Sequence, residues 1–301
     1  MRKLLILAAS AFCLLSCEII TDTSGVLNHV SIGVADMDMS NFPVQTKADL
    51  EIVEGKFRFT WTSDDIVGMF PNRGAQAYFE MADFEGSNQA EFDGGGWALK
   101  SASEYAVYYP YSYDHRERTS IPMHYRGQKQ NGKGSFDHLK NFQHLATGAS
   151  KPVDGECNYS MDRAEAIVRF RVKLPRIAAY NELSIKLSDG TPIVVSSTLD
   201  VSGSKYAISS SETVHQYILS LENVSTTVEN EEVDFYLALP PQNFTGKKLI
   251  ISVNTVEGDS CQAEVDGKFD LENNKAYQYS ATLTTEFGSS GESFEGIDGN
   301  W

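Results

Sequence analysis

Gly258-Asp259-Ser260 is the segment that comes closest to a catalytic motif, because a serine held in a glycine-containing turn could act as a nucleophile. The glycines that should follow such a serine are replaced by Cys261-Gln262, and the segment lies between two predicted strands. A tight turn accounts for it better. The sequence also contains neither a Gly-x-Ser-x-Gly elbow nor a phosphate-binding loop. It therefore predicts no catalytic residue.

Acidic residues are abundant, and two kinds of chemistry could use them. A spaced pair of carboxylates hydrolyses glycosidic bonds, but nothing in the sequence selects a pair among the 41 Asp and Glu residues. Acidic stretches such as Asp64-Asp65 and residues 229–232 lack the ligand spacing of an EF-hand calcium loop. Solvated turns explain them better, so we do not expect an enzyme.

Four of the six histidines fall between residues 112 and 160, where a metal site could be sought. They are His115, His124, His138 and His144. Metal motifs on helices use tighter spacing than the six residues that separate His138 from His144. We interpret the four as solvated loop histidines and expect neither a metal site nor a cofactor.

Two cysteines, Cys157 and Cys261, lie in the body of the chain. They could form one disulfide in an oxidising compartment, although sequence alone cannot establish the pairing. Unpaired cysteines are among the residues most often buried in protein cores. We expect two unpaired, buried thiols.

Five tyrosines gather between residues 105 and 113 and could form a platform on which a sugar ring stacks. They are Tyr105, Tyr108, Tyr109, Tyr111 and Tyr113. In a strand, alternation turns every second side chain inward. Core packing is therefore the simpler interpretation, and a ligand role is the alternative.

The charge and length of the chain exclude some functions. The formal net charge is −16 over 301 residues. Nucleic-acid binding requires basic residues that displace counterions from phosphates, so we expect no nucleic-acid partner. The length suits two domains of ordinary size.

The first residues have the pattern of an export signal. A basic start at Arg2-Lys3 precedes the apolar run Leu4–Leu15, which is too short to span a bilayer. Leu14-Leu15-Ser16-Cys17 then resembles the bacterial lipobox, in which the cysteine is lipidated. We therefore expect residues 1–16 to be a lipoprotein signal peptide and Cys17 to carry acyl chains that anchor the chain in a membrane.

Alternating hydrophobicity dominates the remainder and predicts strands. Val26, Val30, Ile32 and Val34 share one face of a first strand, and an irregular stretch at residues 37–47 follows. The same period of two recurs in many later segments, among them Phe57–Trp61, Ile66–Phe70, Tyr105–Tyr109, Ala166–Leu174, Val233–Leu239 and Tyr277–Leu283. Residues 112–160 alternate little, and residues 137–147 could form a helical turn. No long amphipathic helix is evident, so the sequence predicts an all-β fold.

Several motifs, taken in order, resemble the fimbrillins, which are lipoprotein subunits of the type V pili of Bacteroides-like bacteria. The resemblance extends over most of the mature chain. It is carried by Phe57–Trp61, Asp64–Gly68, Tyr108–Tyr111, Ile121-Pro122 with Gln128 and Gln130, Ala166–Val172, and Asn274–Tyr279. One departure is Asp64, which stands where the family usually has glycine.

The resemblance implies two transthyretin-like Greek-key β-sandwich domains in tandem. We place the N-terminal domain at residues 48–160 and the C-terminal domain, with a flexible donor-like tail, at residues 161–301. Residues 17–47 would then be a lipidated N-terminal segment whose first strand can be removed.

The resemblance also implies assembly by strand exchange. A trypsin-like protease would cut after Lys47, although the family usually has arginine there. Release of the strand with Val26, Val30, Ile32 and Val34 would open an apolar groove, and a neighbour's tail would fill it. The candidate donor side chains are Tyr277, Tyr279, Leu283, Phe287, Phe294, Ile297 and Trp301.

The expected function is thus that of a structural, accessory or anchor subunit of a cell-surface fimbria, with other pilus subunits as partners. Before maturation the lipid would attach it to the outer membrane. A permanent first strand remains an alternative interpretation of residues 26–34. The alternative function is a cell-surface adhesin or glycan-binding lipoprotein of the same fold.

Overall fold

The structure is a computed structural model that describes residues 27–38, 50–53, 56–84, 86–94, 102–152 and 157–285. Strands make up almost all of its regular structure, and one short 3₁₀ helix, η1 (Asp137–Phe142), interrupts them. The predicted all-β fold is confirmed. None of the helices in the described ranges has the length and apolar character needed to cross a membrane.

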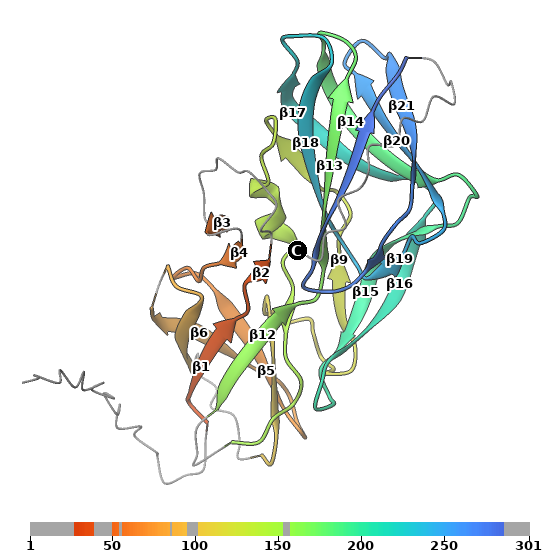
Figure 1. The fold of residues 1–301 in the computed structure, drawn as a ribbon. Coiled ribbons are helices and arrows are strands. Elements are labelled where there is room, and N and C mark those ends of the chain that lie inside the picture. The colour runs from red at the N-terminus through yellow and green to blue at the C-terminus, as the bar shows by residue number, and fades with distance from the viewer. Residues whose placement is uncertain are drawn as a thin grey trace, which may run out of the picture.

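Seven strands form a closed barrel in the lower part of the molecule, in the order β1-β12-β11-β8-β5-β6-β7 (Figure 1). Closure leaves no sheet edge exposed in this unit. The strands are β1 (His29–Val34), β5 (Ile66–Pro71), β6 (Ala77–Asp83), β7 (Gln89–Gly94), β8 (Tyr105–Tyr109), β11 (Leu145–Ala146) and β12 (Asn158–Arg163). A small sheet beside the barrel has the order β2-β4-β3 and contains β2 (Met37–Asp38), β3 (Leu50–Val53) and β4 (Lys56–Phe59).

The upper part of the molecule is built from sheets that enclose a second core. The five-stranded sheet β10-β17-β14-β20-β21 and the three-stranded sheet β18-β13-β23 contribute most of its side chains. These strands are β10 (Lys129–Asn131), β13 (Ala166–Leu174), β14 (Ala179–Leu187), β17 (Tyr217–Ser225), β18 (Glu231–Leu239), β20 (Lys248–Thr255), β21 (Ser260–Asp266) and β23 (Ala276–Thr282). The sheet β16-β15-β9 and the pair β19-β22 complete it, with β9 (Ile121–His124), β15 (Ile193–Asp200), β16 (Ala207–Val214), β19 (Gln242–Asn243) and β22 (Asp270–Leu271).

Each unit has its own core, and a third cluster joins them. Trp61 is fully buried in the barrel, with its ring centroid 4.6 Å from that of Phe59 and 4.9 Å from that of Phe92. The joining cluster mixes side chains from barrel strands, such as Tyr108, with side chains from the upper sheets, such as Tyr236. The two units therefore share buried apolar surface.

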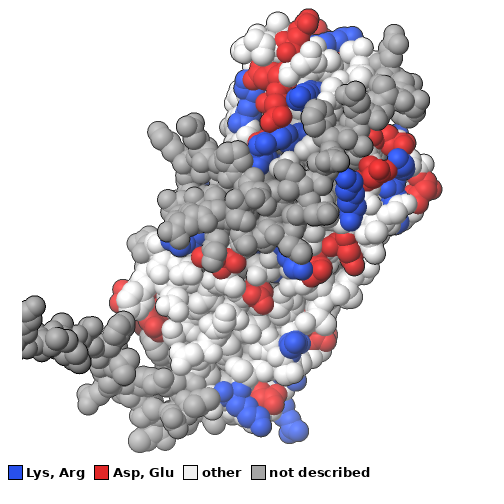
Figure 2. All heavy atoms as spheres, in the orientation of Figure 1, with Lys and Arg blue, Asp and Glu red and all other residues white. Residues whose placement is uncertain are grey.

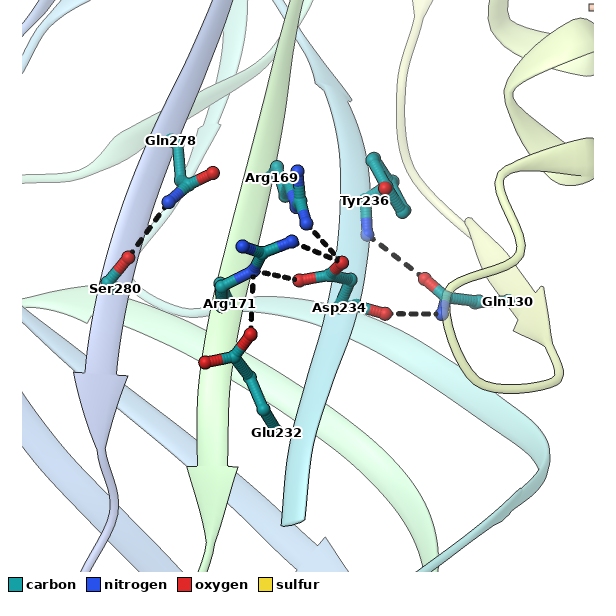
Figure 3. Close-up of polar contacts among 8 residues, drawn as sticks. All are labelled: Gln130, Arg169, Arg171, Glu232, Asp234, Tyr236, Gln278 and Ser280. Atoms are coloured by element: carbon teal, nitrogen blue, oxygen red, sulfur yellow. Dashed lines mark hydrogen bonds and ion pairs between the residues drawn. The ribbon is translucent and has the colours of Figure 1, made fainter. Parts of the chain in front are cut away.

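Two glutamines seal one edge of the sheet β18-β13-β23. The Gln130 side chain accepts a hydrogen bond from the Tyr236 N–H (3.0 Å) and donates one to the Asp234 carbonyl (2.9 Å), as Figure 3 shows. Gln128 does the same with both backbone groups of Ala238, at 3.0 and 2.6 Å. Each amide thus replaces a peptide group of a neighbouring strand, so β18 keeps no free edge there.

We expect Gln128→Leu to destabilise the protein by about 2–5 kcal/mol, because it leaves the buried N–H and C=O of Ala238 without partners. Urea denaturation would measure the change. Lys129→Ala is the matched control, since the exposed ion pair of Lys129 with Glu222 contributes only about 0–1 kcal/mol. Equal effects of the two substitutions would contradict the role of the glutamine.

The predicted strands with strong alternation are confirmed, whereas residues 112–160 hold three strands that alternation did not reveal, β9 to β11, and the start of β12. The predicted helical turn corresponds to η1. The predicted boundary after residue 160 falls inside β12, which belongs to the barrel, while β9 and β10 pair with upper strands β15 and β17. Residues from both sides of that boundary thus contribute to each unit, and the division into domains stays a prediction.

Candidate assembly site

The first strand, β1, lies inside the barrel sheet and not at its margin (Figure 1). It pairs antiparallel with β7, where Val30 stands opposite Phe92, and parallel with β12, where Ile32 stands opposite Tyr159. The hydrogen bond from Gly94 N–H to the Asn28 carbonyl (2.8 Å) extends the first pairing by one residue. Removal of β1 would therefore leave two strands without their hydrogen-bonding neighbour.

Side chains of β1 alternate strictly between core and exterior. Val30, Ile32 and Val34 are 1%, 0% and 3% exposed and pack in the barrel core with Trp61 and Phe92. The intervening residues face outward and are half-buried. Just beyond the strand, Met37 is fully buried in the cluster that joins the two units. The segment thus fills a continuous apolar slot.

His29 anchors the outer face at the start of β1. Its Nε2 lies 2.8 Å from a Glu91 oxygen, and its Nδ1 lies 2.6 Å from a Asp93 oxygen. Both carboxylates belong to β7. A protonated imidazole donates a hydrogen bond to both carboxylates, whereas a neutral one has a single N–H and can donate to only one of them.

A buried arginine marks the other end of β1. Arg163, at the end of β12, is fully buried, and its guanidinium carbon lies 5.9 Å from the Phe59 ring centroid. The β1–β12 register, extended by two residues, sets it beside Asp36, which follows β1. Burial lowers the pKa of Arg163 to about 10, against the opposing influence of the Glu165 and Asp36 charges. Burial also raises the pKa of Glu165 to about 7. Glu165 and Asp36 are thus the two carboxylates whose charges offset that of Arg163.

Three of the predicted donor side chains already have a place in the protein's own core. Tyr277 and Tyr279 lie on β23, which pairs parallel with β13, and Leu283 follows directly after that strand. All three are buried in the upper core, and the Tyr279 ring stacks on Phe170 at 5.7 Å. Donating them to a neighbour would require the upper unit to lose one of its own strands.

The outer side of the same sheet carries a charge cluster (Figure 3). Asp234 on β18 forms ion pairs with Arg169 and Arg171 on β13, and Arg171 also approaches Glu232 at 3.2 Å. Burial raises the pKa of Asp234, while Arg171 acts in the opposite direction. Partnered charges of this kind hold β13 and β18 in register and offer no catalytic group.

The prediction that His138 and His144 are solvated is wrong. His138 is 9% exposed, with Nε2 3.0 Å from the Tyr236 carbonyl oxygen, and the His144 ring packs edge-on against Tyr125 at 5.1 Å. Burial lowers the pKa of both to about 4. Among the residues the structure describes, no group of His, Cys, Asp and Glu side chains is arranged to hold a metal ion.

These histidines should make the protein less stable in acid. An unfolded histidine binds a proton near pH 6.5, whereas folded His138 binds it near pH 4, so protons favour the unfolded state between these values. When the pH falls from 6.5 to 4, wild type should lose up to about 3 kcal/mol more of its free energy of unfolding than His138→Gln does. Urea titrations at several pH values would measure it.

Glu165 works in the opposite direction, since its raised pKa favours the folded state as the pH falls from about 7 to 4.5. The quantity to compare is therefore the change in the free energy of unfolding with pH, in wild type and in His138→Gln, since Glu165 contributes equally to both. His215→Gln, at an exposed position, is the control. An unchanged pH profile in His138→Gln would contradict the assignment.

Both body cysteines, Cys157 and Cys261, are free and buried, as predicted. Gly258-Asp259-Ser260 lies at the turn between β20 and β21, where Asp259 forms an ion pair with Arg176. The turn interpretation of this segment fits the structure.

The tyrosine group divides between core and surface. Tyr105 and Tyr108 are buried, as core packing requires, whereas Tyr113 is 68% exposed. The Arg116 guanidinium carbon lies 4.1 Å from the Tyr113 ring centroid, and the Tyr111 and Tyr78 rings are 5.6 Å apart. The outer tyrosines thus form a small aromatic surface with one cation.

Other predicted site residues lie outside the described residues. They are Cys17, Val26, Lys47, Phe287, Phe294, Ile297 and Trp301. Their predicted roles stay predictions. Sequence reasoning missed Arg163, because its only signal is an arginine at a core-facing position of a short strand.

Comparison with solved structures gives the fold an independent reference. A candidate cell-adhesion protein from Bacteroides ovatus is similar with a TM-score of 0.55 and 14% identity, over 86% of this chain and 95% of that one. Another from Bacteroides uniformis has a TM-score of 0.52 and 13% identity, over 85% of this chain and 93% of that one. These likenesses support the fold alone.

Sequence comparison identifies the family. No curated protein matches the sequence. The profile of the family described as Fimbrillin-like matches residues 46–296, which is most of the chain and agrees with the resemblance found in the motifs. The chain belongs to the fimbrillin-like family.

Proposed function

We propose that this protein is a subunit of a cell-surface fimbria and that it assembles by exchange of its first strand. The observation that carries the proposal is the position of β1: a strand between two others, with Val30, Ile32 and Val34 in the barrel core. One stretch of chain, residues 39–49, connects it and β2 to the remainder, and Lys47 lies in that stretch. A single cut there would make β1 replaceable.

Processing would follow the specificity of a trypsin-like protease. Cleavage after Lys47 leaves Ala48 as the new N-terminus and frees residues up to 47, which include β1 and Met37. The vacated slot would expose apolar side chains and the hydrogen-bonding edges of β7 and β12. Such an edge accepts an extended segment readily, because backbone bonds provide affinity and alternate pockets provide specificity.

The donor would be the segment after β23. Tyr277, Tyr279 and Leu283 are engaged in the upper core, so donation that preserves this core has to use the later residues. Phe287, Phe294, Ile297 and Trp301 supply large apolar side chains in that segment. Each buried side chain of this size contributes about 1.5–3 kcal/mol, from which the cost of ordering the segment is subtracted.

The signal sequence and Cys17 support a route to this location. Acyl chains on Cys17 would hold the precursor in the outer membrane, and the cut after Lys47 would separate the folded part from its anchor. An uncut copy would stay attached and could serve as anchor or accessory subunit. Membership in a fimbrillin-like family favours a structural role over an enzymatic one.

Electron microscopy of the expressed protein tests the proposal. Wild type should form polymers, and mass spectrometry should find an N-terminus at Ala48. Lys47→Ala and a chain without residues 288–301 should both remain monomeric. Lys151→Ala, which changes an exposed lysine in another loop, is the control. A wild type that keeps only the Cys17 start and never polymerises would rule out assembly by this route.

An adhesin that binds glycans is the second candidate. The surface formed by the half-buried Tyr78 and Tyr111 and the exposed Tyr113 and Arg116 favours it, since aromatic rings stack on sugar faces and arginine binds acidic sugars. A glycan-array signal should be lost in Tyr111→Ala and kept in Phe84→Ala, which alters another exposed aromatic residue. A signal insensitive to Tyr111 would remove this candidate.

A further inference from the structure

The slot that β1 fills has the buried Arg163 at one end, and Asp36, which follows β1, offsets its charge. In the parallel pairing of β1 with β12, Val34 stands opposite Met161, and the Ala35 N–H donates to the Met161 carbonyl at 3.0 Å. Two residues further on, the same register sets Asp36 beside Arg163. The Asp36 carboxylate is 18% exposed, and an oxygen of it also lies 3.8 Å from Arg58 Nε.

Arg163 belongs to the part of the chain that stays, while Asp36 belongs to the part that would leave. Loss of a carboxylate neighbour from a fully buried guanidinium raises the free energy of the cut protein, because low-polarity surroundings do not solvate the charge. Glu165 remains beside Arg163, but the second of its two carboxylate neighbours is lost with Asp36. A replacing strand that brings a carboxylate to the Asp36 position would therefore bind more tightly than one that does not.

We propose that Arg163 selects the donor strand, and that the tail of a second copy of this chain meets it with Glu295. The inference rests on the proposed function, whose strand exchange it makes specific. In the slot, the pattern to be matched is a carboxylate at position 36 and apolar side chains at 34, 32 and 30. Glu295, Ile297 and Trp301 match positions 36, 34 and 30 in reverse order along the chain, and Gly299 would stand at position 32.

Direction follows from this match. In the orientation of β1, a donor needs a carboxylate two residues after an apolar side chain, and none of Phe287, Phe294, Ile297 and Trp301 is followed in this way. In the opposite orientation the carboxylate comes two residues before, as Glu295 does for Ile297. Glu292 precedes Phe294 in the same way, but that register would place the charged Asp298 at the buried position of Val30. The donor would thus run antiparallel to β12 and parallel to β7.

In this register, the outward-facing residues of the donor are also compatible with the neighbouring side chains. Gly296, Asp298 and Asn300 would alternate with the inward residues and take the positions of Ala35, Gly33 and Ser31. Ser31 stands opposite Glu91, so the uncharged Asn300 would meet that carboxylate without repulsion. Gly299 would take the place of Ile32, between the larger Ile297 and Trp301. The small residue leaves room for the indole, which replaces Val30.

Peptide exchange tests the inference in the full chain. A specific protease site is placed after Lys47, the folded protein is cut, and release of the retained, fluorescently labelled first strand is followed after addition of the peptide 286–301. The wild-type peptide should displace the strand. The E295Q peptide should be weaker by at least about 30-fold, as expected for removal of one partner of a buried charge pair. The E292Q peptide is the matched control and should remain within about twofold of wild type.

Two further measurements locate the contact and its direction. In Arg163→Met, wild-type and E295Q peptides should become equal; if that variant does not fold, Asp36→Asn should instead speed release of the resident strand. A photoreactive group at position 301 should cross-link beside Phe92 on β7, opposite Val30. Cross-links beside Met161 would mean the other direction.

The outcomes separate the inference from the proposed function. Equal displacement by wild-type and E295Q peptides, or no displacement by either, would overturn the inference even if polymers form. If electron microscopy shows no polymers but the wild-type peptide still displaces the strand better than the E295Q peptide, the proposed function would be overturned. The selectivity of the slot would then remain established.

Discussion

A chain that begins at Ala48 is expected to lose the native barrel when it is isolated without a donor. It lacks Val30, Ile32, Val34 and Met37, each almost fully buried in the complete protein. At about 1.5–3 kcal/mol per side chain, the loss is about 6–12 kcal/mol. The whole stability of a typical domain is about 5–15 kcal/mol. Urea denaturation and dye binding to exposed apolar surface would measure the effect.

The control for this expectation is a chain that begins at Leu27, which keeps β1 and should unfold cooperatively. Addition of a peptide of residues 27–38 to the shorter chain should restore cooperative unfolding, since it returns the same side chains to the slot. The interpretation fails if the Ala48 chain alone melts at the same temperature as the Leu27 chain and binds no dye. Val30–Val34 would then contribute little to the barrel.

The sequence predicted elements well where burial is carried by apolar side chains. In β13, Val168, Phe170 and Val172 alternate with charged residues, and the predicted strand Ala166–Leu174 has the bounds that the structure shows. The core face of β1 was identified in the same way. Alternation works here because each strand has one face against a core and the other against polar groups.

Prediction from alternation failed where the buried residues of a strand are polar. Gln128 and Gln130 alternate around Lys129 and are fully buried, but they are not apolar, so β10 was overlooked. Pro122 similarly obscures β9, whose Ile121 and Met123 are buried. His138 was misjudged because nothing local shows that η1 packs on β18. Long-range pairing decides all three cases.

Charged side chains are distributed unevenly over the two units. On the face shown in Figure 2, Lys, Arg, Asp and Glu are mixed over the upper unit, while the lower barrel is mostly uncharged. A neighbour approaching this face of the barrel would therefore meet few charged side chains. The charges at the slot, Arg163 at one end and the Glu91–Asp93 pair at the other, would then decide direction.

The interlocking of the two units leads to a final expected result: residues 161–301 alone should not fold. The fragment lacks Ile121, Met123 and Tyr125, which are buried against upper strands, and both glutamines that seal β18. The three apolar side chains represent about 5–9 kcal/mol of burial. Several backbone groups on β18 would also lose their partners. A proton–nitrogen correlation spectrum should show poor dispersion.

A peptide of residues 119–134 should rescue this fragment, because it carries both β9 and β10 with their partners. The same peptide with Gln128→Leu and Gln130→Leu is the matched control and should rescue poorly, since it keeps the apolar side chains but cannot bond Ala238 or Tyr236. A well-dispersed spectrum from residues 161–301 alone would contradict this expectation and support an independent domain from residue 161 onward. Dependence on the peptide would instead mean that the upper unit is completed by a strand from the other half of the chain, as the barrel is completed by β1.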